Sequence, residues 1–174
     1  TLSGKKFQAK RNLIKRFCDN PNWAYEEISK ENIDECIELN LSWSDERDSS
    51  NIEIRKELGA ANTALSHFEE LGLKGGLIRR EGRVVAYSLG ERLTNDTFVI
   101  HFEKADDNIK GAYQIINNEF AKHNCADFEF INREEDNGEE GLRKAKLSYH
   151  PAFLIEKGKK KGKLTASVKE EYKN

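Results

Sequence analysis

The spacing of apolar residues in the first half of the chain changes between helical and extended periods. An apolar stripe along the first segment, backed by lysines and arginines on the other faces, predicts a basic amphipathic helix. A Pro-Asn turn follows, and a short run then alternates as a strand. Beyond it, apolar residues recur at three- and four-residue steps up to Gly72, the stop signal of a helix. The predicted elements are a helix over Leu2–Cys18, a strand over Trp23–Ile28, and helices over Asn32–Trp43 and Ile54–Leu71.

In the second half of the chain, the residue pattern predicts first a sheet and then alternating helices and strands. Three short β-rich runs are joined by Glu81-Gly82 and by Thr94–Asp96, both turn signals, so they predict a three-stranded antiparallel meander. An amphipathic stripe then predicts a helix, and Pro151 stops the last one. The predicted elements are strands over Gly75–Ile78, Val84–Gly90, Thr97–Phe102 and Asp127–Ile131, helices over Ile109–Phe120 and Glu140–Ser148, and a final strand over Ala152–Glu156.

This order of elements predicts an α/β fold, a mixed sheet flanked by helices like that of the GNAT acyltransferases. We expect Asp127–Ile131 to lie beside the last strand of the meander and to diverge from it, so that the segments after Phe102 and Ile131 flank a working cleft. With 174 residues, the chain is the right size for one such domain.

Composition narrows the function classes. No apolar run is long enough to cross a bilayer, and the first residues are basic where a signal peptide is apolar, so a cytoplasmic protein is expected. The three cysteines and four histidines are dispersed, with none at metal-ligand spacing, so neither a disulfide framework nor a metal site is predicted. The chain opens at Thr1 in mid-helix, which indicates a fragment.

The formal net charge of −2 conceals two basic ends and one acidic loop. Lysines and arginines cluster before Asp19 and again after Glu156, whereas carboxylates crowd the segment Glu134–Glu140. Basic arms suit an anionic partner, but a solvated surface is the commoner explanation for such clusters.

The segment Asn132–Pro151 mixes carboxylates, cations and a tyrosine at a strand end. In a functional interpretation, Glu134 or Asp136 is the base that deprotonates an attacking group and Tyr149 is the proton donor. Arg143 and Lys146 are three residues apart on one helix and would meet an anionic oxygen together. In a structural interpretation, the segment is a solvated loop followed by a helix with pairs such as Glu140 and Lys144.

Three stretches of the sequence resemble the phosphatidylglycerol lysyltransferase C-terminal domain family. They are Leu2–Lys6 with Lys10-Arg11-Asn12, Glu103–Asp106, and Asn132–Pro151. The resemblance implies that residues 1–20 are a basic connector helix between two GNAT-like domains, that residues 21–174 are the second of them, and that an N-terminal partner domain is missing. It also implies transfer of an amino acid from aminoacyl-tRNA to a lipid headgroup or, as in Fem-type relatives, to a peptide amine.

The resemblance also implies candidate residues for this chemistry. Tyr149 matches the position of a GNAT general acid. Lys10, Arg11 and Asn12 are candidates for contact with tRNA or lipid phosphates. The remaining candidates for substrate binding are Asp106, Asn132, Arg133, Arg143 and Lys146.

No tightly bound cofactor is expected, and tRNA is the expected partner. Acetyl-CoA is the less favoured donor, because Asp106 and Asp107 stand where GNAT enzymes bind pyrophosphate and would instead attract an ammonium group. Two alternatives stay open: an acetyl-CoA-dependent N-acetyltransferase, and a non-catalytic scaffold that binds RNA or an anionic surface.

Overall fold

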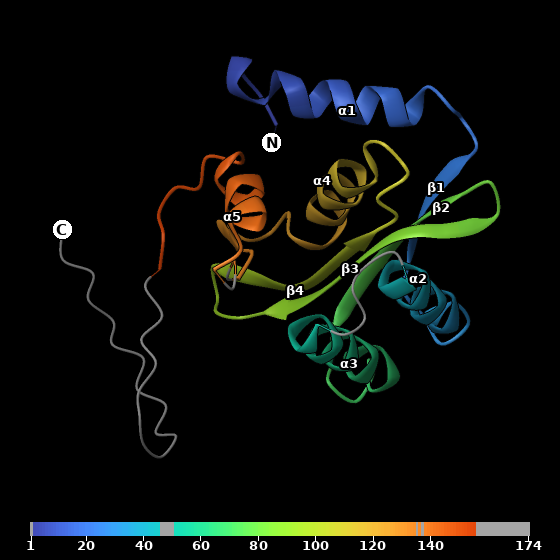
Figure 1. The fold of residues 1–174 in the computed structure, drawn as a ribbon. Coiled ribbons are helices and arrows are strands. Elements are labelled where there is room, and N and C mark those ends of the chain that lie inside the picture. The colour runs from blue at the N-terminus through green and yellow to red at the C-terminus, as the bar shows by residue number, and fades with distance from the viewer. Residues whose placement is uncertain (1, 46–50, 135, 137, 156–174) are drawn as a thin grey trace.

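The structure, a computed structural model, describes residues 2–45, 51–134, 136 and 138–155. Its centre is a five-stranded sheet with the strands in sequence order (Figure 1). The first four strands are antiparallel to their neighbours, and the fifth runs parallel to the fourth. The strands are β1 (Trp23–Glu27), β2 (Lys74–Arg80), β3 (Arg83–Arg92), β4 (Thr97–Ala105) and β5 (Phe130–Asn132).

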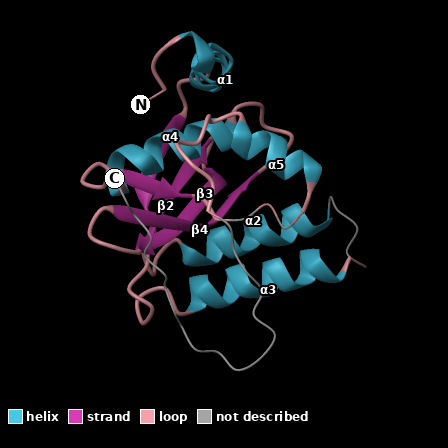
Figure 2. Cartoon of the chain, turned by 90° about the vertical axis from the view of Figure 1, so that its left-hand side faces the viewer, coloured by secondary structure: helices cyan, strands magenta, loops and turns pink. Residues whose placement is uncertain are grey.

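Helices cover both faces of this sheet. In Figure 1, α1, α4 and α5 lie on one face and α2 and α3 on the other, and Figure 2 shows α2 and α3 side by side. The helices are α1 (Gln8–Cys18), preceded by the 3₁₀ turn Lys5–Phe7, α2 (Ile33–Asp45), α3 (Ile52–Ser66), α4 (Ala112–Asn124) and α5 (Glu140–Leu147). The predicted α/β class and GNAT-like mixed sheet are confirmed.

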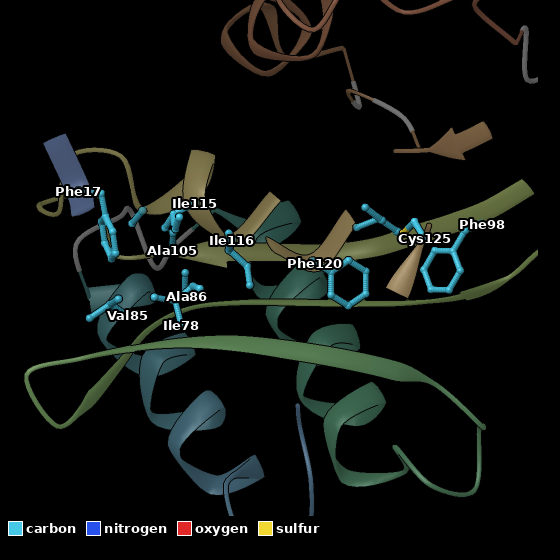
Figure 3. Close-up of a cluster of buried hydrophobic side chains, with 12 residues drawn as sticks. Phe17, Ile78, Val85, Ala86, Phe98, Ala105, Ile115, Ile116, Phe120 and Cys125 are labelled. Carbon is cyan, nitrogen blue, oxygen red and sulfur yellow. The ribbon is translucent and has the colours of Figure 1, made fainter. Parts of the chain in front are cut away.

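Each face of the sheet has its own apolar core. On the α4 side, Phe17 of α1 and Phe120 of α4 are fully buried against Ile78 and Ala86 of the sheet (Figure 3). On the other side, Leu65 of α3 packs with the sheet residues Leu77 and Leu89 and with Cys36 of α2. Since Phe17 anchors α1 in the first core, α1 has a fixed position over α4.

The predicted meander and its first turn are confirmed. Arg80 pairs with Arg83 across the two-residue turn Glu81-Gly82, and both turn residues have positive φ, as hairpins of this type require. β5 pairs with β4 only over Thr97–Val99, so β4 continues to Ala105 without this neighbour. The predicted place of this strand beside β4 is confirmed, and because β5 ends at Asn132, the second half of β4 has no strand neighbour on that side.

Several predicted boundaries are wrong. Leu2–Gly4 precede the helical part of the N-terminal segment, and α3 ends at Ser66, before a series of turns. α4 begins at Ala112 rather than at Ile109, since Gly111 at its N-cap has a left-handed φ of 92°. Ala152–Ile155 do not form a strand, and Glu156, the last residue of that prediction, lies outside the described residues. Across the described ranges, no helix has both the length and the apolar character to cross a membrane.

Candidate functional site

Because β5 ends at Asn132, polar side chains lie beside the second half of β4 in place of a paired strand. Glu103 lies there on the α4 face, with a side chain that is 11% exposed. Its carboxylate accepts hydrogen bonds from Arg133 Nη2 at 2.7 Å and from Asn117 Nδ2 of α4 at 3.0 Å. Arg133 directly follows β5, so this ion pair joins the end of β5 to the second half of β4.

The described residues do not provide a hydrogen-bond acceptor for every N–H group of Arg133. Its Nη2 binds Glu103, but its Nε is buried without a hydrogen-bond partner. A buried guanidinium N–H without an acceptor is unfavourable, and such groups are typical of sites that bind a ligand or ordered water. Its carbonyl oxygen accepts a hydrogen bond of 2.7 Å from Lys146 Nζ of α5.

Tyr149, just beyond α5, lies among cations. The ammonium nitrogen of Lys10 is 3.5 Å from the centroid of its ring, and the guanidinium carbon of Arg133 is 4.6 Å from it. Lys10 Nζ also donates to Ser148 Oγ at 2.8 Å, which ties α1 to the end of α5. Burial raises the pKa of Tyr149 to about 12, although the positive charge of Arg133 acts in the opposite direction. The phenol therefore keeps its proton at neutral pH.

We call Lys10, Glu103, Arg133, Lys146 and Tyr149 the Tyr149 cluster. It contains three cations and one carboxylate. Burial lowers the pKa of both lysines, and the neighbouring charge of Arg133 lowers each further. These shifts indicate that positive charge is concentrated and partly desolvated, so an anionic or carbonyl oxygen would be stabilised there.

The two predicted catalytic carboxylates point elsewhere. Glu134 accepts a hydrogen bond from His101 at 2.9 Å, and His101 also contacts Glu91 at 3.0 Å through its other ring nitrogen. Asp136 pairs with Arg143 at 2.6 Å, and this hydrogen bond lowers the pKa of the Asp136 carboxyl. Asp136 is therefore a poor base, and the predicted joint action of Arg143 with Lys146 is absent, because the two side chains have different partners.

Other predicted residues shape the backbone or lie apart. Asn132 Oδ1 accepts a hydrogen bond from the backbone N–H of Glu134, which stabilises the turn after β5. Arg11 binds the carbonyl oxygens of Leu2 and Gly4. Asn12 Oδ1 accepts from Gln8 within α1. Among the predicted phosphate ligands, only Lys10 joins the Tyr149 cluster.

Asp106 lies in the loop before α4. It pairs with Arg83 at 2.7 Å and accepts the backbone N–H of Asn108 at 2.9 Å. Its negative charge is thus offset by an arginine rather than presented to a substrate.

Glu103 and Asn117 are site candidates that the sequence analysis missed. Glu103 belongs to a stretch that carries the family resemblance, and alternation along β4 places it on the same face as Ala105, which packs against α4. That shared face is the sequence feature that points to Glu103 as a site candidate. No periodicity connects Asn117 to Glu103, because that contact depends on how α4 crosses the sheet.

The described residues include no group of three His, Cys, Asp or Glu side chains that would bind a metal ion. The Tyr149 cluster has more cations than carboxylates, which suits an anionic or carbonyl-bearing ligand.

Comparison with known proteins places this arrangement in a family. Residues 1–157 match the family described as phosphatidylglycerol lysyltransferase, C-terminal. The chain belongs to this family. A relative from Mycoplasmoides gallisepticum, an uncharacterised protein, is 31% identical over 167 residues, which cover 90% of the chain and 51% of that protein. The predicted family resemblance is thereby confirmed.

Two solved structures bear on this C-terminal family fold. A conserved protein of unknown function from Bacteroides thetaiotaomicron is 45% identical, with a TM-score of 0.79 over 88% of this chain and 53% of that one. The C-terminal domain of a protein assigned as lysylphosphatidylglycerol synthetase from Agrobacterium fabrum is 16% identical, with a TM-score of 0.59 over 87% of this chain and 53% of that one. The chain thus spans about half the length of these relatives.

The same fold occurs in proteins of ordinary acetyltransferase length. A protein assigned as an acetyltransferase from Clostridium difficile is 11% identical, with a TM-score of 0.60 over 82% of this chain and 99% of that one. This likeness shows a GNAT-like fold. The connector role of residues 1–20 and the partner domain stay predictions.

Proposed function

We propose that this member of the phosphatidylglycerol lysyltransferase C-terminal family is an acyltransferase, and that it moves an amino acid from aminoacyl-tRNA to an amine or hydroxyl acceptor at the Tyr149 cluster. The observation that carries the proposal is Tyr149 itself. Its phenol retains its proton and lies beside Lys10 and Arg133, where β5 has ended and β4 continues.

The chemistry of aminoacyl transfer matches these groups. Attack of the acceptor on the ester carbonyl forms a new C–N or C–O bond and places negative charge on the carbonyl oxygen, which Arg133 and Lys146 would stabilise. When the ester C–O bond breaks, the leaving oxygen of the ribose needs a proton, and Tyr149 supplies it. The proton lost by the acceptor returns to the phenolate, so Tyr149 is restored.

Glu103 has a positioning role in this proposal. Its bonds to Arg133 and Asn117 hold the guanidinium between β4 and β5, and its charge reduces the repulsion among the three cations. Asp106 and Asp107 add negative charge to the loop where GNAT acetyltransferases bind the pyrophosphate of CoA, although Arg83 offsets that of Asp106.

The test is transfer of a labelled amino acid from aminoacyl-tRNA by the full polypeptide that the gene encodes, with lipid and amine acceptors supplied separately. We expect Tyr149→Phe to lower turnover by about a hundredfold with the fold intact. Tyr25→Phe is the matched control. Tyr25 lies on β1, away from the cluster, and its hydroxyl accepts a hydrogen bond of 2.8 Å from Asn124 Nδ2 of α4. Acetyl transfer from acetyl-CoA, or equal rates for wild type and Tyr149→Phe, would reject the proposal.

A further inference from the structure

His101 of β4 is a partly buried histidine outside the Tyr149 cluster. Its Nδ1 lies 2.9 Å from the carboxylate of Glu134, in the turn after β5, and its Nε2 lies 3.0 Å from that of Glu91 on β3. The register of β4 against β3 shifts here, so that His101 is an extra residue between Ile100 and Phe102, and such irregularities redirect a side chain. The imidazole of His101 therefore bridges β3 and the turn after β5.

β4 holds two consecutive residues of this turn through side chains of opposite charge. Glu103 accepts a hydrogen bond from the guanidinium of Arg133, and His101 contacts the carboxylate of Glu134. Arg133 also lies against the ring of Tyr149, so the turn carries one of the cations of the Tyr149 cluster. A change in the contact between His101 and Glu134 therefore acts on the residue next to that cation.

The turn depends on side-chain contacts for its position. β5 ends at Asn132, so the chain beyond it has no strand partner on β4. Glu134 has a φ of 54°, in the left-handed region that residues with a side chain rarely adopt. Asn132 Oδ1 accepts the backbone N–H of Glu134 at 2.8 Å, and Lys146 Nζ donates to the carbonyl oxygen of Arg133. Because strand pairing does not fix this conformation, loss of a side-chain contact can shift it.

Both contacts of His101 can be hydrogen bonds only while the ring is protonated. An ionised carboxylate is an acceptor without a proton to donate, and a neutral imidazole has one N–H and one lone pair. The imidazolium alone donates to Glu91 and Glu134 together, and when it loses its proton one carboxylate faces a lone pair. Within the described residues, the charged groups in contact with His101 are these two carboxylates, from β3 and from the turn after β5. Burial lowers the pKa of His101, but the two hydrogen bonds outweigh it, so the folded protein favours the protonated, bridging form.

We propose that protonated His101 is a positioning residue for Arg133, because it fixes the turn after β5 to β3. The ring does not touch the reacting groups and acts through the turn. The bridge should be closed at low pH and open at high pH, so the position of Arg133 in the Tyr149 cluster becomes sensitive to pH. The effect on turnover rests on the proposed function, whereas the bridge is a property of the protein without any substrate.

NMR spectra of the protein at a series of pH values test the bridge without donor or acceptor. The ring nitrogens of His101 report its protonation, and the Nε–H of Arg133, which is buried without an acceptor among the described residues, reports the surroundings of the guanidinium. We expect the Arg133 resonance to shift with the same midpoint as the His101 ring, and we expect His101→Gln to abolish that shift. An Arg133 resonance that is constant through the His101 titration, or that titrates unchanged in His101→Gln, overturns the proposal.

Glu91→Gln separates the bridge from its dependence on pH. The amide introduced there donates to the ring nitrogen that a neutral imidazole leaves without a proton, while the other nitrogen still donates to Glu134. Both contacts then persist at high pH, so the Arg133 resonance should no longer follow the protonation of His101. This variant keeps His101 in place, so it decides the question even if His101→Gln is poorly folded. A shift as large as that of wild type would contradict the proposal.

The pH profile of transfer by the full polypeptide relates the bridge to turnover. We expect the ratio of wild-type turnover to that of His101→Gln to be about tenfold at low pH and to fall toward one as pH rises past about 6.5. A structural role alone would give a ratio that is independent of pH, and that result would overturn the positioning role.

His67→Gln is the matched control for the pH profile. Its ring also contacts a glutamate, Glu70, at 2.9 Å, but it does so at the end of α3. The ratio of wild-type turnover to that of this variant should stay near one at every pH. Absence of transfer in wild type would reject the proposed function alone, because the NMR result decides whether the bridge positions Arg133.

Discussion

Glu103 and Lys104 are consecutive residues of β4 that face opposite sides of the sheet and belong to different kinds of polar cluster. Glu103 belongs to the Tyr149 cluster, where three cations share one carboxylate and the Nε of Arg133 has no partner. Lys104 is 2% exposed on the α2–α3 face and pairs with Glu57 of α3. Beside it, Tyr87 donates to Asn40 at 2.8 Å, and Asn40 donates to Asn62 at 2.7 Å.

The two clusters differ in how many of their charges and hydrogen-bonding groups are paired within the protein. We call Lys104, Glu57, Tyr87, Asn40 and Asn62, on the α2–α3 face, the Lys104 network. In this network, opposite charges are matched and buried polar groups are paired. Such a network fixes helices on a sheet. The Tyr149 cluster keeps excess charge and an unpaired donor, which costs stability and is retained where a ligand completes the arrangement. Buried charge alone would not separate these two roles.

The largest expected difference between the two clusters is in the effect of Glu103→Gln on transfer. We expect it to lower transfer by about a hundredfold, because Arg133 loses its counter-charge and its fixed position. The free energy of unfolding should fall by only about 1–2 kcal/mol. Transfer assays and urea denaturation measure the two effects. Rescue of activity by Glu103→Asp would support a positioning role, and unchanged turnover in Glu103→Gln would remove the residue from the site.

Substitution of Lys104 probes the other face. Lys104→Ala should lower the free energy of unfolding by about 2 kcal/mol, because it leaves a cavity where the buried stem packs. Lys104→Met keeps the volume and removes the charge, so it should cost less than about 1 kcal/mol, since Glu57 is 46% exposed and can be hydrated. Denaturation curves of both variants give the comparison. Equal losses in Lys104→Met and Lys104→Ala would mean that the ion pair, which both variants remove, and not the packing is the stabilising element.

Loss of the hydroxyl group should affect stability differently at Tyr87 and at Tyr149. Tyr87→Phe should lower the free energy of unfolding by about 1–2 kcal/mol, because the Oδ1 of the buried Asn40 loses its donor. Tyr149→Phe should change it by less than about 0.5 kcal/mol, because phenylalanine keeps the ring that Lys10 and Arg133 contact. Thermal and chemical denaturation of both variants measure this. Equal losses would show that Tyr149 is a packing residue.

The surroundings of His101 lead us to expect a small dependence of stability on pH. Burial lowers the pKa of His101, but its hydrogen bonds to Glu91 and Glu134 outweigh burial and the net shift is upward from 6.5. A raised folded-state pKa means that the protonated form stabilises the fold. This contribution is complete below the unfolded pKa of about 6.5 and is lost as pH rises through the folded pKa.

Denaturation at a series of pH values measures this effect as the difference between wild type and His101→Gln. Subtracting the variant removes the titration of other groups. The difference should shrink as pH rises above about 6.5. A difference that grows with pH would contradict the sign of the shift.

The sequence was sufficient for the sheet and for most helices, because their signals are local. Alternation and the Glu81-Gly82 turn identified β2, β3 and β4, and the structure extends each by a few residues. The end of α3 was overestimated because Phe68 and Leu71 continue its helical spacing, although the chain there turns toward β2 and leaves Leu71 51% exposed.

The site was less predictable, because its contacts cross long stretches of sequence. Tyr149, Arg133 and Lys146 come from the predicted segment, but Lys10 reaches Ser148 across 138 positions, a contact that no local pattern encodes. Only their residue type makes Asp136 and Glu134 candidates for the catalytic base. Their partners, Arg143 and His101, became evident only once the turn after β5 was placed.

The alternation along β4 also constrains how this protein can change over generations. The register of β4 against β3 shifts so that His101 is an extra residue between Ile100 and Phe102, and a deletion there would leave both halves of the strand facing as before. A deletion of Phe102 or an insertion after it would instead exchange the faces, with a lysine directed toward the side of Arg133 and a carboxylate buried against α3. Sequence drift can therefore alter side chains along β4, but its length after this irregularity should be nearly invariant. Changes in length should collect instead in the hairpin that precedes it, where residues 92–96 are exposed.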